Sequence, residues 1–550
     1  MQQSEELLTL LNIAAHGHEQ MLRLYLAKGG HPNAVIHVNE DTLAPFDTST
    51  ADARANPEEV KEWALLTYYC IQGWSRQIVI LLHANADPNG VEGLEPPMCA
   101  AAERGRTDIM QLLLSRGAAV NCSTSEHPTP LMFAAKSGHV SAVSWLCQQG
   151  ADINSKHLMP DKGGHLSALI WATYRGHLDV LQYLDSCGAA LSVGTGATRN
   201  TALHEAALNS QFECLQYVLG TEAGRDLVHE WNWTGCTPLQ VAAEMSDDVR
   251  IISALIDAGS DINAQDNGHD TPLGFAVFKN KAETVRVLCN RGADVMLDNQ
   301  MDGTSIVAQG VHAGCSKAVR ALMMSDAWQA LTSQQRCERE ETLAHDCTDP
   351  ATLKAVLAHA HDVPALLSYT DREGDTALHM ALIFDRSAAV VSMLLEAGAD
   401  VTAENNLDRT AVVSGASVGS NVAVEALMTA ATWQALTRGK RLELEQSLAY
   451  CCKDAETLKV VLAHALDVPN MLSYADDNEN TALHRAARRG KPAPFVCMLL
   501  KAGADYTLEN AYGLTPADVA HDLGHCGTCR DRTARHLRAQ VARIGRYTRA

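Results

Sequence analysis

The sequence contains no hydrophobic run that could cross a membrane, because no stretch approaches about 18 consecutive uncharged apolar residues. Its first residues carry Glu5 and Glu6 where a secretory signal would carry basic charge and then a long apolar run. Aromatic residues make up only 5% of the chain, while alanine and leucine are prominent, which suits close contacts between helices. We therefore expect a cytoplasmic protein with no membrane span.

Basic residues are also scarce, since 44 Lys and Arg stand against 65 Asp and Glu and give a net charge of −21 at pH 7. An acidic field of this kind repels phosphate backbones, which argues against nucleic-acid binding. With 46% hydrophobic and 20% charged residues, the composition is that of a folded protein. A chain of 550 residues is too long for one core and predicts several domains or one repeat array.

The cysteines do not indicate a disulfide framework. All 16 are scattered along a long chain, from Cys70 to Cys529, and most lie in apolar helical patterns, as Cys147, Cys214 and Cys289 do. This distribution is typical of reduced thiols packed in a reducing compartment.

Phosphate-binding and metalloprotease motifs are missing as well. The sequence has no G-x-x-x-x-G-K-[ST], no H-E-x-x-H and no G-x-G-x-x-G after a strand. A Cys–His catalyst would need a domain outside the repeats to hold it in a cleft, and we expect no enzyme and no cofactor.

What the sequence does contain is a repeat of about 33 residues. Thr-Ala-Leu-His begins at Thr201, Thr376 and Thr481, and Thr-Pro-Leu stands in the same place at Thr129, Thr237 and Thr271. About twenty residues after each comes a second signal of the form Gly-Ala-Asp, as in 149–154 and 397–402.

One copy, residues 126–154, predicts the structure of a repeat. Thr129 caps a helix whose first turn holds Pro130, and Gly138 ends that helix. Leu131, Ala134 and Ala135 form its packed face. Val140, Val143, Leu146 and Cys147 then follow at helical spacing on a second helix, which Gly150 stops. The repeat is therefore a helical hairpin that stacks on its neighbours.

This composite motif resembles the ankyrin repeat family, and Gly138-His139 and Gly176-His177 supply its Gly-His element. The resemblance implies an all-α solenoid of about fifteen helical-hairpin repeats, several of them degenerate. In that family the first helices line a concave face and the loops before them project as fingers. It also implies that His204, His379 and His484 hydrogen-bond the loop of a neighbouring repeat.

A second period of 105 residues shows an internal duplication. Residues 318–381 match 423–486 without a gap, with 37 identities in 64 positions, and Trp328-Gln-Ala-Leu-Thr332 returns as Trp433-Gln-Ala-Leu-Thr437. We divide the chain into an N-terminal capping repeat (1–30), a polar acidic insertion forming a long mobile loop (31–59), repeats (60–297), a three-repeat block (298–402), its duplicate (403–507), and a last repeat with a basic capping helix (508–550).

Candidate metal ligands have an alternative explanation at each place. His521, His525, Cys526 and Cys529 lie within nine residues, but Gly524-His525 falls on the repeat's own Gly-His position, and ordinary repeat packing is favoured. His359 and His361 form an H-x-H pair of which the duplicate keeps only His464. We therefore expect no bound metal.

Binding residues are expected at the end of each first helix, because these positions follow the paired small residues and should face a partner. Aromatic residues, Met and Arg, which interface centres favour, are frequent there. Trp231 and Trp233 add either an anchor on a finger or a buried contact. The candidate partner-binding residues are Arg104, Lys136, Tyr174, Arg175, Trp231, Trp233, Met245, Phe278, Lys279, Phe384, Arg488 and Arg489.

We conclude that the sequence encodes a monomeric, non-catalytic scaffold or adaptor that binds a partner protein. Two alternatives stay open: a secreted effector that hijacks host proteins through the same repeats, and an enzyme with a site in the degenerate regions 302–370 and 408–475. The tail 530–550 carries seven arginines and is either an end cap or a basic helix for an acidic partner, lipid or nucleic acid.

Overall fold

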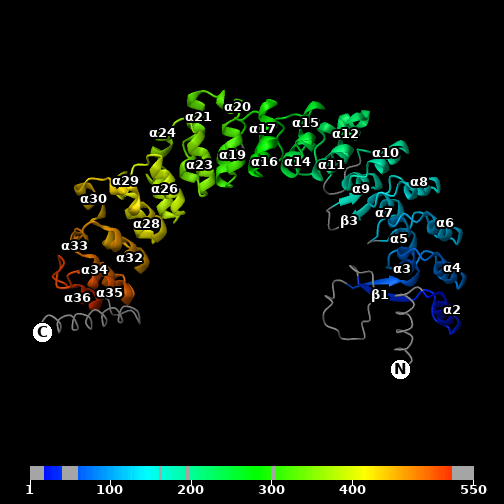
Figure 1. Cartoon of the computed structure of the whole chain (residues 1–550), viewed down its shortest axis with the longest axis horizontal. Helices are drawn as coiled ribbons and strands as arrows, with labels where there is room; N and C mark the ends of the chain where they lie inside the picture. The colour runs from blue at the N-terminus through cyan, green and yellow to red at the C-terminus, as the bar shows by residue number, and fades with distance from the viewer. Residues whose placement is uncertain are drawn as a thin grey trace. The chain divides into compact units, whose positions relative to one another are not determined.

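The computed structural model describes residues 18–39, 60–124, 127–159, 164–192, 199–298 and 304–522. The chain divides into two compact bodies, residues 1–275 (the N-terminal body) and 276–550 (the C-terminal body). Each is a succession of helical hairpins that lie side by side, and each hairpin has a first and a second helix (Figure 1). The expected all-α repeat fold is confirmed, with two small two-stranded sheets added to it.

In the N-terminal body the first helices are α3 (Leu65–Gln72), α5 (Pro97–Glu103), α7 (Pro130–Lys136), α9 (Ala168–Arg175), α11 (Ala202–Leu208) and α14 (Pro238–Met245). The second helices are α2 (Glu19–Ala27), α4 (Ser75–His83), α6 (Thr107–Ser115), α8 (Val140–Gln148), α10 (Leu178–Ser186), α12 (Phe212–Gly220) and α15 (Val249–Asp257). The short helices α13 (Glu222–Asp226) and η3 (Leu227–His229) follow α12, and α16 (Pro272–Phe278) spans the boundary between the bodies.

In the C-terminal body the first helices are α18 (Ile306–His312), α22 (Leu343–Asp346), α25 (Ala377–Ile383), α27 (Ala411–Val418), α31 (Leu448–Cys451), α34 (Ala482–Arg488) and α36 (Pro516–Asp522). The second helices are α17 (Ala282–Asn290), α19 (Ser316–Met323), α23 (Pro350–His359), α26 (Ala388–Glu396), α28 (Asn421–Thr429), α32 (Ala455–His464) and α35 (Ala493–Lys501). Six further helices are α20 (Asp326–Gln329), α21 (Ser333–Glu340), α24 (Val363–Ser368), α29 (Ala431–Gln434), α30 (Arg438–Glu445) and α33 (Val468–Ser473).

The hairpin α7–α8 forms as its sequence predicts. The Thr129 hydroxyl accepts a hydrogen bond from the Met132 N–H at 3.4 Å and so caps α7. Gly138 follows α7 with φ +78°, and a Cβ there would lie 2.6 Å from the imidazole of His177 in the next hairpin. Glycine is therefore required both by the backbone conformation and by the close approach of the neighbouring hairpin.

Burial explains why the hairpins must stack. In α7 and α8, residues Leu131, Ala134, Ala135, Val143 and Leu146 are buried, whereas Val140 and Cys147 keep part of their surface exposed. The small alanines let the first helices pack closely in one row, α5 on α7 and α7 on α9, while α8 and α10 pack in the other row (Figure 1).

Asparagine side chains link successive repeats of the N-terminal body. The Oδ1 atom of Asn89 accepts from the Ala119 N–H at 2.8 Å, that of Asn121 from Asp152 at 2.9 Å, and that of Asn154 from Ala190 at 3.0 Å. Each bond satisfies a backbone donor that the turn after a second helix leaves unpaired.

The histidines of Thr-Ala-Leu-His make the hydrogen bonds that the family resemblance implies. In each, Nδ1 accepts from the N–H of the capping threonine, at 3.2 Å for His204, 3.3 Å for His379 and 3.2 Å for His484. Nε2 then donates to a carbonyl of the following loop, at 3.0, 2.9 and 2.9 Å respectively.

Paired strands occur at the insertion 31–59 and again just before α9. The sequence predicts a loop over 31–59, but β1 (Val35–Asn39) pairs antiparallel with β2 (Val60–Ala64), and 40–59 lie outside the described residues. Likewise β3 (His157–Met159) pairs with β4 (Gly164–Leu166). A strand pair satisfies the backbone groups that an irregular loop would leave to water.

The duplicated blocks differ from plain hairpins because helices replace the loop between repeats. In the first block Trp328 is buried, and its Nε1 donates to the buried carboxylate of Glu340 at 3.1 Å. In the second block Trp433 donates to Glu445 at 3.4 Å. The repeated Trp-Gln-Ala-Leu-Thr motif therefore holds α20 against α21 and α29 against α30, so both copies of the block keep the same added structure.

All fourteen cysteines within the described residues are free thiols, as expected from their spacing. Among the described residues, none of the helices has the length and apolar character needed to cross a membrane.

Candidate functional site

The predicted binding positions of the N-terminal body lie at the ends of first helices. Arg104, Arg175 and Met245 are exposed, and Lys136 and Tyr174 are half-buried. Each follows a buried pair of small residues that faces the core, such as Ala134 and Ala135 in α7, so the next side chains must point outward.

Aromatic rings and cations alternate along this row. The Tyr174 ring contacts Trp171 edge-on, with centroids 5.7 Å apart, and the Arg175 guanidinium lies 5.5 Å from the Tyr174 centroid. Lys136 Nζ lies 5.4 Å from the Trp171 ring and 3.9 Å from a Glu103 carboxylate oxygen. These contacts hold flat rings and positive charge in place on the surface, which lowers the ordering cost of binding.

The C-terminal body continues the pattern with more apolar surface. Phe278 is 55% exposed and Phe384 is 65% exposed, although phenylalanine is normally a core residue. Lys279 Nζ lies 5.6 Å from the Phe278 ring centroid. Arg488 and Arg489 are exposed at the end of α34. We call the ends of the first helices in each body the first-helix surface.

The two tryptophans lie in the loop that leads from η3 to α14. Trp231 is 58% exposed and Trp233 is 70% exposed, so the alternative of burial between repeats is wrong. The side chain of Asn232 organises the turn, since its Oδ1 accepts from the N–H groups of Thr234 and Cys236, each at 3.0 Å. A hollow of about 490 Å³ is lined by this loop together with Arg199 and Asn267.

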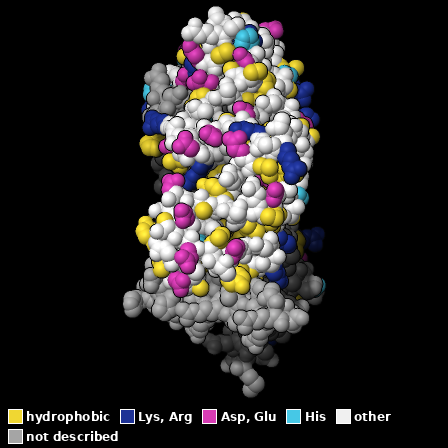
Figure 2. Space-filling view, turned by 90° about the vertical axis from the view of Figure 1, so that its left-hand side faces the viewer, with side chains coloured by type: hydrophobic (Ala, Val, Ile, Leu, Met, Phe, Trp, Pro, Cys, Tyr) yellow, Lys and Arg dark blue, Asp and Glu magenta, His cyan; other side chains and the backbone are white. Residues whose placement is uncertain are grey.

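Elsewhere the surface is a mixture of hydrophobic, acidic and basic side chains. On the face drawn in Figure 2, hydrophobic side chains form small separate spots between acidic and basic ones. The exposed rings of Phe278 and Phe384 at equivalent helix ends, and those of Trp231 and Trp233 in one loop, stand out from this mixed surface.

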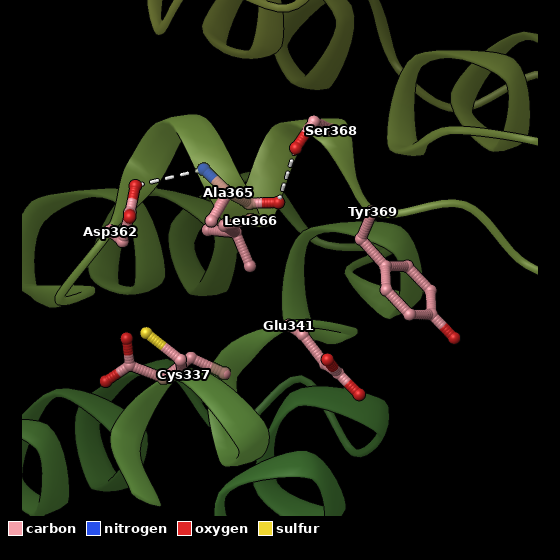
Figure 3. A pocket seen from close by; sticks show the side chains of 8 residues that line it. Cys337, Glu341, Asp362, Ala365, Leu366, Ser368 and Tyr369 are labelled. Atoms are coloured by element: carbon pink, nitrogen blue, oxygen red, sulfur yellow. Dashed lines mark hydrogen bonds between the residues drawn. The ribbon is translucent and has the colours of Figure 1, made fainter. Parts of the chain in front are cut away.

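A small pocket of about 200 Å³ lies between α21 and α24, within the region assigned to the enzymatic alternative (Figure 3). Its polar groups are engaged in local structure. Asp362 accepts from the Ala365 N–H at 3.0 Å and caps α24, and the Ser368 hydroxyl donates to the Ala365 carbonyl at 3.0 Å. Glu340 accepts from Trp328 and, at 2.6 Å, from the His361 N–H. Cys337, Glu341 and Tyr369 also line the pocket.

One pattern typical of serine hydrolases, G-x-S-x-G, does occur in the sequence, at 415–419. It lies at the end of α27 and does not follow a strand. The Ser417 hydroxyl donates to the Ser414 carbonyl at 2.8 Å, and a Cβ at Gly415 would lie 2.9 Å from Leu382. Here the pattern serves helix packing, because the strand-to-turn geometry of a nucleophile elbow is missing.

A buried histidine lies between two carboxylates in the first block. His345 Nδ1 is 3.2 Å from Asp346 and Nε2 is 3.4 Å from Asp371. The hydrogen bond with Asp346 raises the pKa of His345 although burial opposes this. In the duplicate the same position holds Tyr450, whose hydroxyl donates to Asp476 at 2.6 Å. Both copies therefore connect these two positions, through a histidine and an aspartate in the first block and through a tyrosine and an aspartate in the second.

The part of the chain that the structure describes contains no group of three or more His, Cys, Asp or Glu suited to a metal ion. His359 and His361 belong to that part. Of the four C-terminal candidates, His525, Cys526 and Cys529 lie outside the described residues, as do the side chain of His521 and the basic tail.

Comparison with known families decides the identity of the repeats. Ankyrin repeat models match residues 66–332 through four overlapping segments, and further ankyrin models match 373–406 and 465–520. These segments make up more than half of the chain. The chain belongs to the ankyrin repeat family. Ankyrin repeats form protein–protein interaction domains, and this chain carries such a domain.

Curated relatives of this ankyrin chain have varied roles. It is 28% identical over 331 residues to "Transient receptor potential cation channel subfamily A member 1" of Drosophila melanogaster, covering 58% of this chain and 26% of the channel. It is 27% identical over 369 residues to "Ankyrin repeat domain-containing protein SAT10" of Stachybotrys chartarum, covering 61% of this chain and 18% of that protein. The chain thus spans about a quarter or less of either relative.

Among solved structures, the human ASB11 ankyrin repeat domain aligns with a TM-score of 0.37 and 24% identity, over 41% of this chain and 96% of that domain.

Sequence reasoning missed two exposed finger residues, Leu407 and Tyr512, which are 66% and 71% exposed. They are 105 residues apart, and each lies five residues after the end of one of the two blocks. The signal was available, because each follows the Asn-x that opens the finger of an ankyrin repeat.

Proposed function

We propose that this protein is a non-catalytic scaffold or adaptor that binds a partner protein through its first-helix surface and fingers. The observation that carries the proposal is the exposure of Phe278 and Phe384, with Tyr174 half-exposed, at equivalent helix ends. Leaving such rings in water costs free energy that burial against a partner would recover, about 2 kcal/mol for each ring.

The chemistry of the described pockets agrees with a binding role. In the pocket between α21 and α24, Asp362, Ser368 and Glu340 already make the hydrogen bonds that hold α24 and the Trp328 indole. A secreted effector would use the same surface, and the enzymatic alternative would have to use the remaining lining groups, Cys337, Glu341 and Tyr369.

Affinity purification with the whole protein as bait tests the proposal. The variant Tyr174→Ala/Phe278→Ala/Phe384→Ala should lose a partner that the wild type retains from cytosolic lysate. The control Met324→Ala/Val422→Ala removes residues of similar exposure, 52% and 48%, from the C-cap of one second helix and the first turn of another. Equal retention by wild type and both variants would contradict the proposal.

A further inference from the structure

The two copies of the duplicated block differ on the surface around the equivalent helices α25 and α34. At an offset of 105 residues, the outward positions Thr348, Met380, Ile383 and Phe384 of the first copy become Lys453, Arg485, Arg488 and Arg489 in the second. Arg386 becomes Lys491. Buried positions such as Trp328, Glu340 and Leu343 are unchanged as Trp433, Glu445 and Leu448. The fold has been kept while one surface changed from apolar to basic.

We call Lys453, Arg485, Arg488, Arg489 and Lys491 the α34 basic patch. Lys453, Arg488 and Arg489 are exposed, and Arg485 is half-buried with its guanidinium 4.3 Å from the Tyr450 ring centroid. Lys491 Nζ donates to the Lys453 carbonyl, which ties α34 and the residues after it to the preceding hairpin. The patch is therefore held in shape by a ring stack and a backbone contact.

The three arginines of this patch have no carboxylate partner in the part of the chain that the structure describes. Within the described residues, no carboxylate oxygen lies within 4 Å of the guanidinium nitrogens of Arg485, Arg488 or Arg489. Burial lowers the pKa of Arg489, and the charge of Arg485 lowers it further. Burial likewise lowers the pKa of Lys491, with Arg489 adding to the effect.

Two acidic side chains close to the patch hold local structure, and the charge of one of them, Asp454, raises the pKa of Lys491. Asp454 accepts from the N–H and hydroxyl of Thr457, at 2.9 and 2.8 Å, and caps α32. Asp476 accepts from Tyr450 and from the N–H of Asn480. An arginine cluster with no carboxylate partner among the described residues, on a protein of net charge −21, is a place where an external carboxylate would be bound.

We infer that the α34 basic patch binds an acidic segment of the partner protein. This inference rests on the proposed function and specifies the chemistry of one end of the first-helix surface. A segment with a few Asp or Glu residues supplies a carboxylate for each of the exposed cations Lys453, Arg488 and Arg489. A long polyanion would also meet Asp477 and Glu479, exposed on the finger at the other end of α34, about 10 Å along the helix.

Peptide binding to the full chain tests the inference. The probe is a fluorescein-labelled 12-residue peptide with six Glu residues spaced by Gly and Ala, and its control has Gln at those six positions. In fluorescence anisotropy, the Glu peptide should bind at least tenfold more tightly than the Gln peptide at 50 mM KCl. Its affinity should fall at least tenfold at 500 mM KCl, because salt screens exposed charges.

Charge reversal locates the site. Arg488→Glu/Arg489→Glu should weaken binding of the Glu peptide at least tenfold. The control Arg320→Glu/Lys501→Glu makes the same change in net charge at exposed sites on the second helices α19 and α35, and it should change affinity less than twofold. Equal weakening by both variants would show a general charge effect and overturn the inference.

Two competitors test the class of ligand. A 20-nucleotide single-stranded DNA or vesicles containing phosphatidylserine should bind less tightly than the peptide, and tighter binding of either through Arg488 and Arg489 would overturn the inference. Retention of the natural partner separates the two claims. If Arg488→Glu/Arg489→Glu leaves both peptide and partner bound while Tyr174→Ala/Phe278→Ala/Phe384→Ala loses the partner, only the inference fails.

Discussion

His204 should make the N-terminal body less stable in mild acid. The side chain is fully buried in α11, and burial lowers its pKa to about 4 from an ordinary value of 6.5. Its Nδ1 accepts from the Thr201 N–H and its Nε2 donates to the Cys236 carbonyl, so the folded chain holds one neutral tautomer. A proton on Nδ1 would face the Thr201 N–H.

The direction in which stability changes with pH follows from the difference between the folded and unfolded pKa of His204. Because the folded pKa lies below the unfolded value, the unfolded chain binds a proton first as the pH falls below 6.5. Stability contributed by the neutral histidine is therefore complete above pH 6.5 and is lost between pH 6.5 and about 4. The loss amounts to about 2 kcal/mol at pH 5 and about 3 kcal/mol at pH 4.

The chain offers its own control for this prediction. At the same position of α14, Gln240 accepts from the Thr237 N–H at 2.8 Å and donates to Ala264 and Asp270 carbonyls at 3.1 and 2.8 Å. His204→Gln should therefore keep the cap and the loop contact without a titrating group. Urea unfolding followed by circular dichroism should show wild type and variant within about 1 kcal/mol at pH 7 and diverging by about 2 kcal/mol at pH 5. Parallel loss of stability in both proteins would refute the reasoning.

Three further predictions concern the C-terminal body. Glu445→Gln should lower the free energy of unfolding in urea by about 3 kcal/mol, because the buried carboxylate accepts from Arg441 at 2.6 Å and from the Leu466 N–H at 2.6 Å. The control Glu443→Gln changes an exposed residue of the same helix and should lower it by less than about 0.5 kcal/mol. Equal losses in the two variants would contradict the prediction. Glu340→Gln, the equivalent change in the first block, should lower the free energy of unfolding less than Glu445→Gln does. Among the described residues the Arg336 guanidinium pairs with Gln329 and with no carboxylate, so Glu340 lacks the arginine partner that Glu445 has. A larger loss for Glu340→Gln would be evidence against the stabilising role of the Arg441–Glu445 ion pair. The pKa of His345 is raised in the folded protein, so the stability that the charged histidine contributes is complete below pH 6.5 and is lost as the pH rises through the folded-state pKa. His345→Tyr copies Tyr450 of the second block and should remove this loss of stability when unfolding is measured from pH 6 to 9.

The fold could be predicted from the sequence because the residues that form each repeat lie close together in the sequence. Thr129, Gly138 and the alanine pair of α7 each act within one hairpin or between neighbours, so reading them locally is enough. The helices α20 and α21 were not predicted. Their formation depends on the Trp328 indole meeting the Glu340 carboxylate twelve residues away, a contact that no periodic pattern signals.

The sequence predicted which residues of the candidate site are exposed better than it predicted the contacts that they make. The two positions after the small pair of each first helix include Phe278 and Phe384, which lie on the surface because helix geometry fixes that direction. The stacking of Lys136 on Trp171 and the lack of internal partners around Arg488 depend on neighbouring hairpins and appear only in three dimensions.

Site-specific photo-crosslinking tests the central claim most directly. A benzophenone amino acid is placed at 278 or 384 on the first-helix surface, or at 324 or 422 beside second helices, four positions of comparable exposure within the C-terminal body. Irradiation in cells should yield one discrete crosslinked protein from positions 278 and 384 and none from 324 and 422. Crosslinks from 324 and 422 with none from 278 and 384 would show that the partner binds elsewhere on the chain.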